Sequence, residues 1–341
     1  MNDYDLVCGF ESLYRAHYKA KKGKAQKVDV LHFESNLAHN LMILQDELKN
    51  GIYEMKGYRY FRVYEPKMRN IFEVKHVDKI VMHAVCDEVL LPRLSPHFIY
   101  DNAACQKGKG THFALKRFSE KLVRYHKYYG REFYVLKCDI SAYFASIDHS
   151  ILRKLLRKLI KDEKVITLLS HFIDSYWEEG TEGIGLPLGN QTSQWFALYY
   201  LSGFDHYVKE KLGVKGYIRY MDDFLLIHKD KSYLFEILDE INRYLNKELG
   251  LKLNPKTSVV KATTPIEFLG WRFFICEKGE ILRKLKAQSK MRYRRKMRIR
   301  RIQFFNEEIS FVSLAQVVAS YDGHLGHGNT YLLRKKVMAD N

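Results

Sequence analysis

Three aspartates stand where the sequence places the ends of short, β-rich segments. Asp139 follows the apolar run 133–138, and Asp222 with Asp223 lies between two β-rich runs within 217–228. Carboxylate oxygens are ligands that Mg²⁺ prefers, and a pair of such ions about 3.5 to 4 Å apart can catalyse phosphoryl transfer. One ion then lowers the pKa of the attacking hydroxyl, and the other stabilises the leaving group. If the segments form adjacent strands, the three acids could serve such a site.

The same aspartates also have an ordinary structural interpretation. An Asp-Asp pair between strands is typical of tight turns, and Asp139 could cap the segment that follows it. The pair alone does not decide between the two interpretations, so the rest of the sequence has to.

The elements that must position these acids follow from hydrophobic periodicity and turn residues. The expected helices span 33–50, 78–91 (ending before Pro92), 151–173, 192–212 and 233–249, with a basic helix from about Leu285. The expected strands are a basic hairpin at 58–74, the run 133–138, the hairpin 217–228 and a strand at about 267–275. The sequence shows no internal repeat or low-complexity linker.

The composition is that of a folded, strongly basic protein. Of its 341 residues, 46% are hydrophobic and 14% aromatic, which is enough for a substantial core. Lysine and arginine number 57 against 40 aspartates and glutamates, and the formal charge of +17 favours nucleic acid or an anionic membrane surface as a partner. No apolar run approaches the roughly 20 residues that span a bilayer, and the first ten residues do not resemble a signal peptide. We expect a soluble, cytoplasmic protein.

The cysteines and the C-terminal histidines form no metal or disulfide pattern. The five cysteines are scattered without paired spacing, which favours reduced packing residues. His324 and His327 lie in a glycine-containing segment without cysteines at zinc-like spacing, so a packed turn is the favoured interpretation.

The sequence around the acids resembles that of reverse transcriptases. Tyr-Met-Asp-Asp at 220–223 looks like the Tyr-x-Asp-Asp box of that family. Cys-Asp-Ile-Ser-Ala-Tyr-Phe at 138–144 precedes the box, and Leu-Pro-Leu-Gly-Asn-Gln-Thr-Ser-Gln at 186–194 lies between them, in the family's order. Downstream, Leu-Asn-Pro-Lys-Thr at 253–257 and Phe-Leu-Gly-Trp at 268–271 resemble its last two palm motifs. Chance agreement at so many ordered points is negligible, and only the N-terminal and C-terminal thirds are weakly marked.

This resemblance implies an α+β fold, a right-hand polymerase with fingers, a palm of antiparallel sheet plus helices, and a short helical thumb. The implied division of the chain is an N-terminal segment with fingers at 1–132, a palm at 133–280 with a fingers insertion at about 150–188, and a basic helical thumb at 281–341. The implied activity is that of an RNA-directed DNA polymerase, a nucleotidyltransferase.

The resemblance also assigns roles to the acids. Asp139 and Asp222 would bridge two Mg²⁺ ions, or Mn²⁺ in their place, Asp223 would support them, and the carbonyl of Ile140 could add a ligand. Lys256 resembles a lysine that protonates the departing pyrophosphate, although a solvated turn lysine is an equally ordinary interpretation.

A second group of residues would contact the incoming nucleotide. Phe144 stands where the family carries an aromatic ring that clashes with a 2′-hydroxyl, so deoxynucleotides are the expected substrates; a core aromatic is the alternative. Lys67 and Arg69 fall where the fingers present cations to the triphosphate, although both could be surface charges of the hairpin. The other implied nucleotide contacts are Leu188, Gly189 and Gln194.

Two positions depart from common patterns of the family. Leu188 stands where many retroviral relatives have Gln, and Gln194 follows Ser193 where many others have Pro. Reverse transcriptases of diversity-generating retroelements are similar in this Gly-x-x-x-Ser-Gln pattern, in compact length and in lacking an RNase H or maturase extension; they copy a template repeat with errors at adenines. An aliphatic Leu188 cannot hydrogen-bond the nucleotide as Gln would, which could loosen discrimination against mispairs.

The last part of the chain contains a basic helix that could lie along a template–primer duplex. Its cations alternate with apolar residues and could bind phosphates without reading sequence. A membrane-surface or protein-docking helix is the rival interpretation. The glycine-containing segment 106–112 resembles a finger segment that could approach the template. The implied template–primer contacts are Tyr220, Met221, Leu269, Gly270, Lys290, Arg294, Arg295 and Arg298.

The sequence therefore predicts RNA-directed DNA synthesis by two-metal phosphoryl transfer, with error-prone copying in a diversity-generating retroelement. The expected partners are an RNA template and primer, the cDNA product, deoxynucleoside triphosphates and a small basic helical accessory protein. A phage-defence reverse transcriptase, which uses a dedicated noncoding RNA or synthesises without a template, is the alternative. An inactive RNA-binding scaffold is the alternative from another class.

Overall fold

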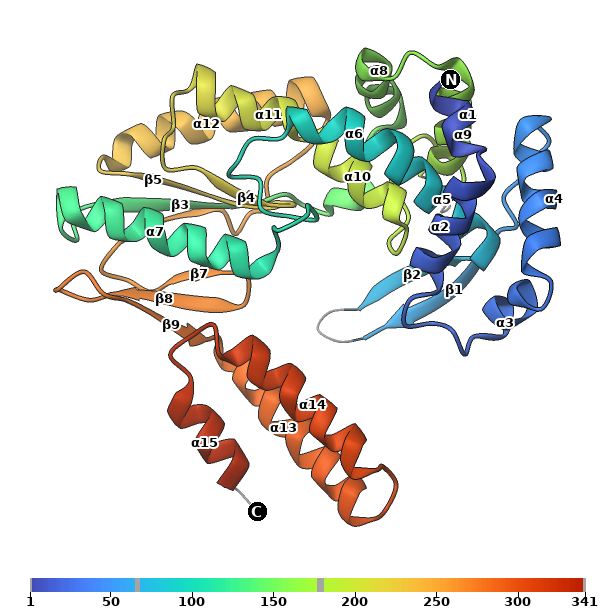
Figure 1. Cartoon of the computed structure of the whole chain (residues 1–341). Coiled ribbons are helices and arrows are strands. Elements are labelled where there is room, and N and C mark those ends of the chain that lie inside the picture. Colours follow the sequence, from blue (N-terminus) through green and yellow to red (C-terminus); the bar gives the residue numbers. More distant parts are fainter. Residues whose placement is uncertain (1, 65–67, 177–180, 340–341) are drawn as a thin grey trace. The chain divides into compact units, whose positions relative to one another are not determined.

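The computed structural model describes residues 2–64, 68–176 and 181–339, which belong to two compact units of mixed helix and sheet (Figure 1). The first unit comprises Met1–Gln106, Ile140–Leu212 and Glu240–Asn254, and the second comprises Lys107–Asp139, Gly213–Asp239 and Pro255–Asn341. Each unit is therefore assembled from separate stretches of the chain. The division into fingers, palm and thumb stays a prediction.

Helices and one antiparallel hairpin make up most of the first unit. In α4, Leu41, Leu44 and Leu48 are buried at helical spacing, as the periodicity predicts. The hairpin expected at 58–74 is confirmed as β1 paired with β2. The elements are α1 (Asp3–Val7), α2 (Phe10–Lys21), α3 (Val28–Glu34), α4 (Leu37–Lys49), β1 (Tyr58–Val63), β2 (Arg69–Val74), α5 (His76–Val85), α6 (Leu91–Leu94), α8 (His149–Leu159), α9 (Glu163–Asp174), α10 (Gln191–Tyr200) and α11 (Ser202–His206).

Several helices expected to be continuous are interrupted in the structure. The helix expected at 151–173 is two helices, α8 and α9, because the Asp162 side chain caps α9 by accepting from the backbone of Lys164 and Val165. Pro92 does not end its helix: the chain continues through a π-helical turn (Cys86–Leu90) into α6, with Pro92 as the second residue of α6. The segments 33–50 and 192–212 are likewise divided, the second into α10, α11 and a π-helical turn (Tyr207–Lys211).

An antiparallel sheet of order β4-β5-β3-β6 forms the centre of the second unit. Its strands are β4 (Ile218–Tyr220), β5 (Asp223–His228), β3 (Tyr134–Asp139) and β6 (Ser258–Lys261), and helix α12 (Lys231–Leu249) follows β5. Val135, Leu136 and Cys138 of β3 are fully buried, as are Phe224 and Leu225 of β5. The uninterrupted buried run of β5 is typical of a strand that is covered on both faces, whereas Lys137 interrupts the run of β3.

Helix α7 (Thr111–Tyr129) runs beside this sheet and beside a second one, of order β7-β8-β9 (Figure 1). The ring of Phe118 lies against the rings of Phe268 and Phe273 from that second sheet. The single strand expected at 267–275 is in fact the hairpin of β7 (Ile266–Phe268) and β8 (Trp271–Ile275), with both turn residues, Leu269 and Gly270, at positive φ. Strand β9 (Ile281–Leu285) was not expected.

The C-terminal segment consists of α13 (Ala287–Phe305), α14 (Phe311–Leu325) and α15 (Tyr331–Ala339). Tyr293 and Met297 of α13 form a small apolar core with Leu325 and Val337. The turn before α15 is packed, as expected, and the ring of His327 stacks on that of His112 with centroids 3.5 Å apart.

In the described ranges, no helix combines the length and apolar character needed to cross a bilayer.

Candidate active site

The three predicted carboxylates lie at one end of the four-stranded sheet, within the second unit. Asp139 is the last residue of β3, and Asp223 is the first residue of β5 and its direct cross-strand partner. Asp223 also pairs with Tyr220 of β4, which leaves Met221 and Asp222 as the two-residue loop between β4 and β5. The structure thus brings together acids that are more than eighty positions apart in the sequence.

The loop between β4 and β5 has an unusual backbone that a buried arginine supports. Met221 has φ +55°, in the left-handed region that costs a residue with a side chain roughly 1–2 kcal/mol. Arg219 is fully buried, and its guanidinium Nη1 donates a hydrogen bond of 3.0 Å to the Met221 carbonyl. This contact fixes the loop that carries Asp222. Sequence reasoning did not identify Arg219 as a positioning residue.

Crowding and burial alter the acidity of these carboxylates. The pKa of Asp223 is raised to about 7, chiefly by burial of its carboxyl group. The positive charge of Lys137 opposes this rise, and that of Lys286 opposes it more weakly. The neighbouring carboxylates of Asp139 and Asp222 raise the pKa further. The Oδ1 atom of Asp223 is buried without a hydrogen-bond partner in the described part of the chain. A buried acceptor without a donor is costly unless a proton or a cation satisfies it.

The donor set suits a divalent metal ion. Three carboxylates supply hard oxygen ligands, and the unpartnered Oδ1 of Asp223 is an acceptor that a cation would satisfy. Among the described residues, no three His, Cys, Asp or Glu side chains are already grouped closely enough to hold a metal. Like charges repel one another, so full convergence of these side chains requires a cation between them. The chemistry of the residues therefore fits the predicted ions.

Three of the residues predicted to contact the nucleotide, Phe144, Leu188 and Gly189, lie on two loops of the first unit that are linked to each other and to β2 by backbone hydrogen bonds. The carbonyl of Phe144 accepts a hydrogen bond of 2.8 Å from the backbone of Leu186, and the carbonyl of Leu188 accepts one of 3.2 Å from Phe72 in β2. Gly189 has φ +120°, and a Cβ there would contact Ile71 and the Phe72 carbonyl. The structure therefore joins Phe144 to the loop at 186–189, and that loop to β2 of the hairpin.

The side chains of the other residues predicted to contact the nucleotide differ in how far they are exposed. Arg69 is exposed at the start of β2, and Gln194 is exposed in the first half of α10. Ile140 is buried and forms an isolated bridge with Leu253. Lys67 lies outside the described residues. The half-buried ring of Phe144 packs edge-on against the buried Tyr143, at a centroid distance of 5.8 Å.

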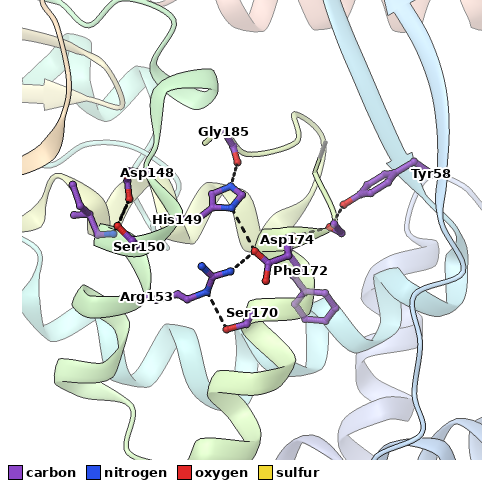
Figure 2. A network of polar contacts seen from close by, with 11 residues as sticks. Tyr58, Asp148, His149, Ser150, Arg153, Ser170, Phe172, Asp174 and Gly185 are labelled. Carbon is purple, nitrogen blue, oxygen red and sulfur yellow. Dashed lines mark hydrogen bonds and ion pairs between the residues drawn. The ribbon is translucent and has the colours of Figure 1, made fainter. Parts of the chain in front are cut away.

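A polar network holds the loop before Leu188 in place (Figure 2). The Nε2 atom of His149 lies 2.6 Å from the carbonyl of Gly185, and its Nδ1 lies 3.5 Å from Asp174. Asp174 also pairs with Arg153, so α8 and α9 are both tied to the loop. His149 is a positioning residue that sequence reasoning missed, because nothing in its local sequence indicates this distant contact.

The predicted template–primer contacts are distributed over three elements of the second unit. Tyr220 and Met221 flank the acids, and the Tyr220 hydroxyl accepts a hydrogen bond of 3.4 Å from Thr111. Leu269 and Gly270 form the turn of the β7–β8 hairpin. Lys256, which was predicted as the proton donor to pyrophosphate and not as a template contact, is exposed in the turn before β6. In α13, Lys290, Arg295 and Arg298 are exposed and Arg294 is half-buried.

Residues 63–273, more than half of the chain, match the family model described as "Reverse transcriptase (RNA-dependent DNA polymerase)". The chain belongs to the reverse transcriptase family. This agrees with the motifs around Asp139 and Asp222, which lie inside the matched range, and with the palm-like arrangement of their strands. Membership of the diversity-generating subgroup is a finer assignment that the family match does not test.

This reverse transcriptase is similar to one named bacterial protein and to several solved telomerase structures. Protein YkfC of Escherichia coli (strain K12) is 28% identical over 286 residues, which are 70% of this chain and 72% of that protein. Among solved structures, telomerase from Candida tropicalis in complex with a fragment of telomeric RNA has a TM-score of 0.51 at 15% identity, and apo telomerase from the same organism has 0.50 at 13%. The alignments cover 67% and 68% of this chain but only 44% and 49% of those chains. This reverse transcriptase thus spans about half the length of the telomerases, whose likeness shows the polymerase fold.

Proposed function

We propose that this reverse transcriptase extends a primer by copying an RNA template into DNA. The observation that carries the proposal is the cross-strand pairing of Asp139 with Asp223, with Asp222 in the adjoining loop, inside a reverse transcriptase domain. The solved Candida tropicalis telomerase in complex with telomeric RNA supports RNA as the template partner. The basic surface of α13 would then bind the phosphates of the template–primer duplex.

The acids are proposed to hold two Mg²⁺ ions, with Asp139 and Asp222 as shared ligands and with Asp223 and the Ile140 carbonyl in support. When bound, the ions would lower the pKa of the primer 3′-hydroxyl and neutralise charge on the departing pyrophosphate. The hydroxyl oxygen forms the new bond to the α-phosphorus, and the bond to pyrophosphate breaks. Lys256, exposed near β6, is the proposed proton donor to pyrophosphate. Arg69, with Lys67, is proposed to bind the triphosphate.

Phe144 is proposed to exclude ribonucleotides by occupying the space that a 2′-hydroxyl needs. Replacing Phe144 with Ala should raise the ratio of kcat/KM for ribonucleotides over deoxynucleotides about 10- to 100-fold, since discrimination by a single steric contact is of that order. Single-nucleotide extension on one RNA template measures the ratio. Phe235→Ala, which truncates an exposed ring of α12, is the matched control. An unchanged ratio in Phe144→Ala would show that the ring is only a packing residue.

Leu188 and Gln194 support a role in a diversity-generating retroelement, with a small basic helical accessory protein as partner. The carbonyl of Leu188 accepts a hydrogen bond from the backbone of Phe72 in β2. The half-buried aliphatic side chain of Leu188 can form no hydrogen bond to the nucleotide. Leu188→Gln should lower misincorporation opposite template adenines about tenfold. Sequencing of cDNA copied from an adenine-rich template measures this, with Leu91→Gln at an exposed leucine as control. The same error spectrum in wild type and Leu188→Gln would contradict the explanation.

The whole proposal is tested by incubating the purified chain with a primed RNA template, Mg²⁺ and each set of nucleotides, and by sequencing the product. DNA with errors opposite template adenines is the expected result. Accurate DNA, or DNA made without a template, would favour the phage-defence alternative. RNA binding without any DNA product, with and without added candidate partners, would favour the inactive scaffold.

A further inference from the structure

A pocket outside the carboxylate site lies on the C-terminal half of α7. Its volume of about 380 Å³ is within the range of small-molecule pockets, about 300 to 1,000 Å³. All of its lining residues belong to the second unit. They include four cations and exposed aromatic rings, namely Arg117, Lys121, Arg124, Lys215, Tyr128 and Tyr129.

The pocket is at the opposite end of the sheet from the acids. Helix α7 ends at Tyr129, just before the start of β3 at Tyr134, whereas Asp139 is at the far end of that strand. Six residues of strand at about 3.3 Å per residue separate the two ends by roughly 17 Å. On the neighbouring strand, the carbonyl of Gly216, next to Lys215, accepts a hydrogen bond from Ile227, near the end of β5 remote from the acids. A ligand in this pocket would therefore not occupy the carboxylate site.

The charges of the pocket favour an anion. Its lining contains a single carboxylate, Glu120, against four cations, Arg117, Lys121, Arg124 and Lys215. Glu120 forms an exposed ion pair of 3.3 Å with Arg117. Lys121 is only 8% exposed, and its Nζ donates to the Lys215 carbonyl at 3.4 Å. A lysine held in this way is a fixed positive charge, and fixed, partly desolvated cations bind phosphate more strongly than mobile surface lysines.

The rings of the pocket offer stacking surfaces beside those cations. Tyr128 is 67% exposed and Tyr129 41% exposed, with their ring centroids 6.3 Å apart. Tyr125 packs between Tyr129 and Phe133, and Gly216 leaves room for its hydroxyl, since a Cβ there would lie 2.8 Å from it. Tyr125 thus supports the more exposed ring of Tyr129. Aromatic faces next to a cationic groove are how proteins bind single-stranded nucleic acid.

We propose that this α7 pocket binds a segment of single-stranded polynucleotide, one base stacking on Tyr128 or Tyr129 and its phosphate contacting Arg124 and Lys121. The chemistry required is an unpaired base next to a phosphodiester, which single-stranded RNA and single-stranded DNA both supply. An acidic protein segment would use the cations but leave the exposed rings without a stacking partner. The site holds a strand away from the catalytic acids, and its binding does not depend on the proposed polymerase activity.

The test measures binding of the full chain to a fluorescent 12-nucleotide oligouridylate, with excess unlabelled template–primer duplex present to occupy the polymerase site. Tyr128→Ala and Arg124→Glu should each weaken binding about tenfold, whereas primer extension on a short template stays unchanged. Lys127→Glu makes the same charge change at an exposed α7 lysine that does not line the pocket, and it should alter binding less than threefold. An oligothymidylate in parallel shows whether the strand is RNA or DNA.

An abasic oligonucleotide of equal charge distinguishes stacking from simple charge attraction. It should bind the wild type more weakly than oligouridylate does, and Tyr128→Ala should not weaken it further. Equal losses in Arg124→Glu and Lys127→Glu would overturn the proposal, because diffuse charge would then explain the binding. Competition by polyglutamate as effective as that by oligouridylate would overturn it in favour of an acidic protein partner. These binding measurements test the α7 pocket even if the wild-type chain shows no polymerase activity.

Discussion

Asp222→Asn is expected to lower primer extension by about 10³-fold, which corresponds to about 4 kcal/mol of lost transition-state stabilisation. Asp222 lies in the loop between β4 and β5, next to the cross-strand pair of Asp139 and Asp223. Asparagine keeps the shape of the side chain but replaces a charged oxygen with an amide that binds divalent cations weakly. The loss should therefore appear in kcat, with little change in the binding of the template–primer duplex.

The fold should survive this substitution, because asparagine keeps the size and shape of the side chain and Arg219 still donates to the Met221 carbonyl. Asp239→Asn, at an exposed aspartate of α12 in the same unit, is the matched control and should keep full activity. Primer extension at saturating deoxynucleotides measures the effect, and thermal unfolding reports on the fold. Activity of Asp222→Asn within tenfold of wild type would remove Asp222 from the proposed metal ligands.

The carboxylate-bearing hairpin was predictable because its signals are local. Two β-rich runs separated by a short acidic turn predict β4 and β5, and the apolar run before Asp139 predicts β3, since strands covered on both faces need continuous apolar sequence. The pairing of Asp139 with Asp223 required the family resemblance, because sequence spacing cannot say which strands become neighbours. The sequence therefore identified the three aspartates as candidates, and the fold shows that they lie at the same end of the sheet.

The supporting residues were not predictable for a related reason. Arg219 and His149 are ordinary polar residues in the sequence, and only tertiary structure shows that each is buried against a backbone carbonyl. The breaks within two elements that the hydrophobic periodicity predicts as continuous were not predictable either. The Asp162 cap divides α8 from α9, and a turn with two positive φ values at Leu269 and Gly270 divides β7 from β8. These local backbone preferences outweigh a hydrophobic pattern that continues across the break.

Asp223→Asn should abolish primer extension but stabilise the metal-free fold at pH 8. Burial and the adjacent carboxylates raise the pKa of Asp223 to about 7, against about 4 in an unfolded chain. Between pH 4 and 7 the folded protein therefore binds a proton that the unfolded chain has lost, so this carboxyl makes stability fall as pH rises. Three pKa units correspond to about 4 kcal/mol, and solvent access to this half-buried group reduces the expected gain to about 1–3 kcal/mol.

The pH dependence distinguishes this explanation from a general effect of the substitution. Thermal unfolding in EDTA should show a Tm several degrees above wild type at pH 8, and no difference at pH 4, where Asp223 of the folded wild type carries a proton. Added Mg²⁺ should raise the Tm of wild type at pH 8 and raise that of Asp223→Asn less, because the variant keeps Asp139 and Asp222 but lacks the third carboxylate. A variant less stable than wild type at pH 8 would mean that the Asp223 carboxylate is already satisfied in the fold. A gain in stability together with a loss of activity would instead show that the Asp223 carboxylate destabilises the metal-free fold and is retained because the bound ions need it as a ligand.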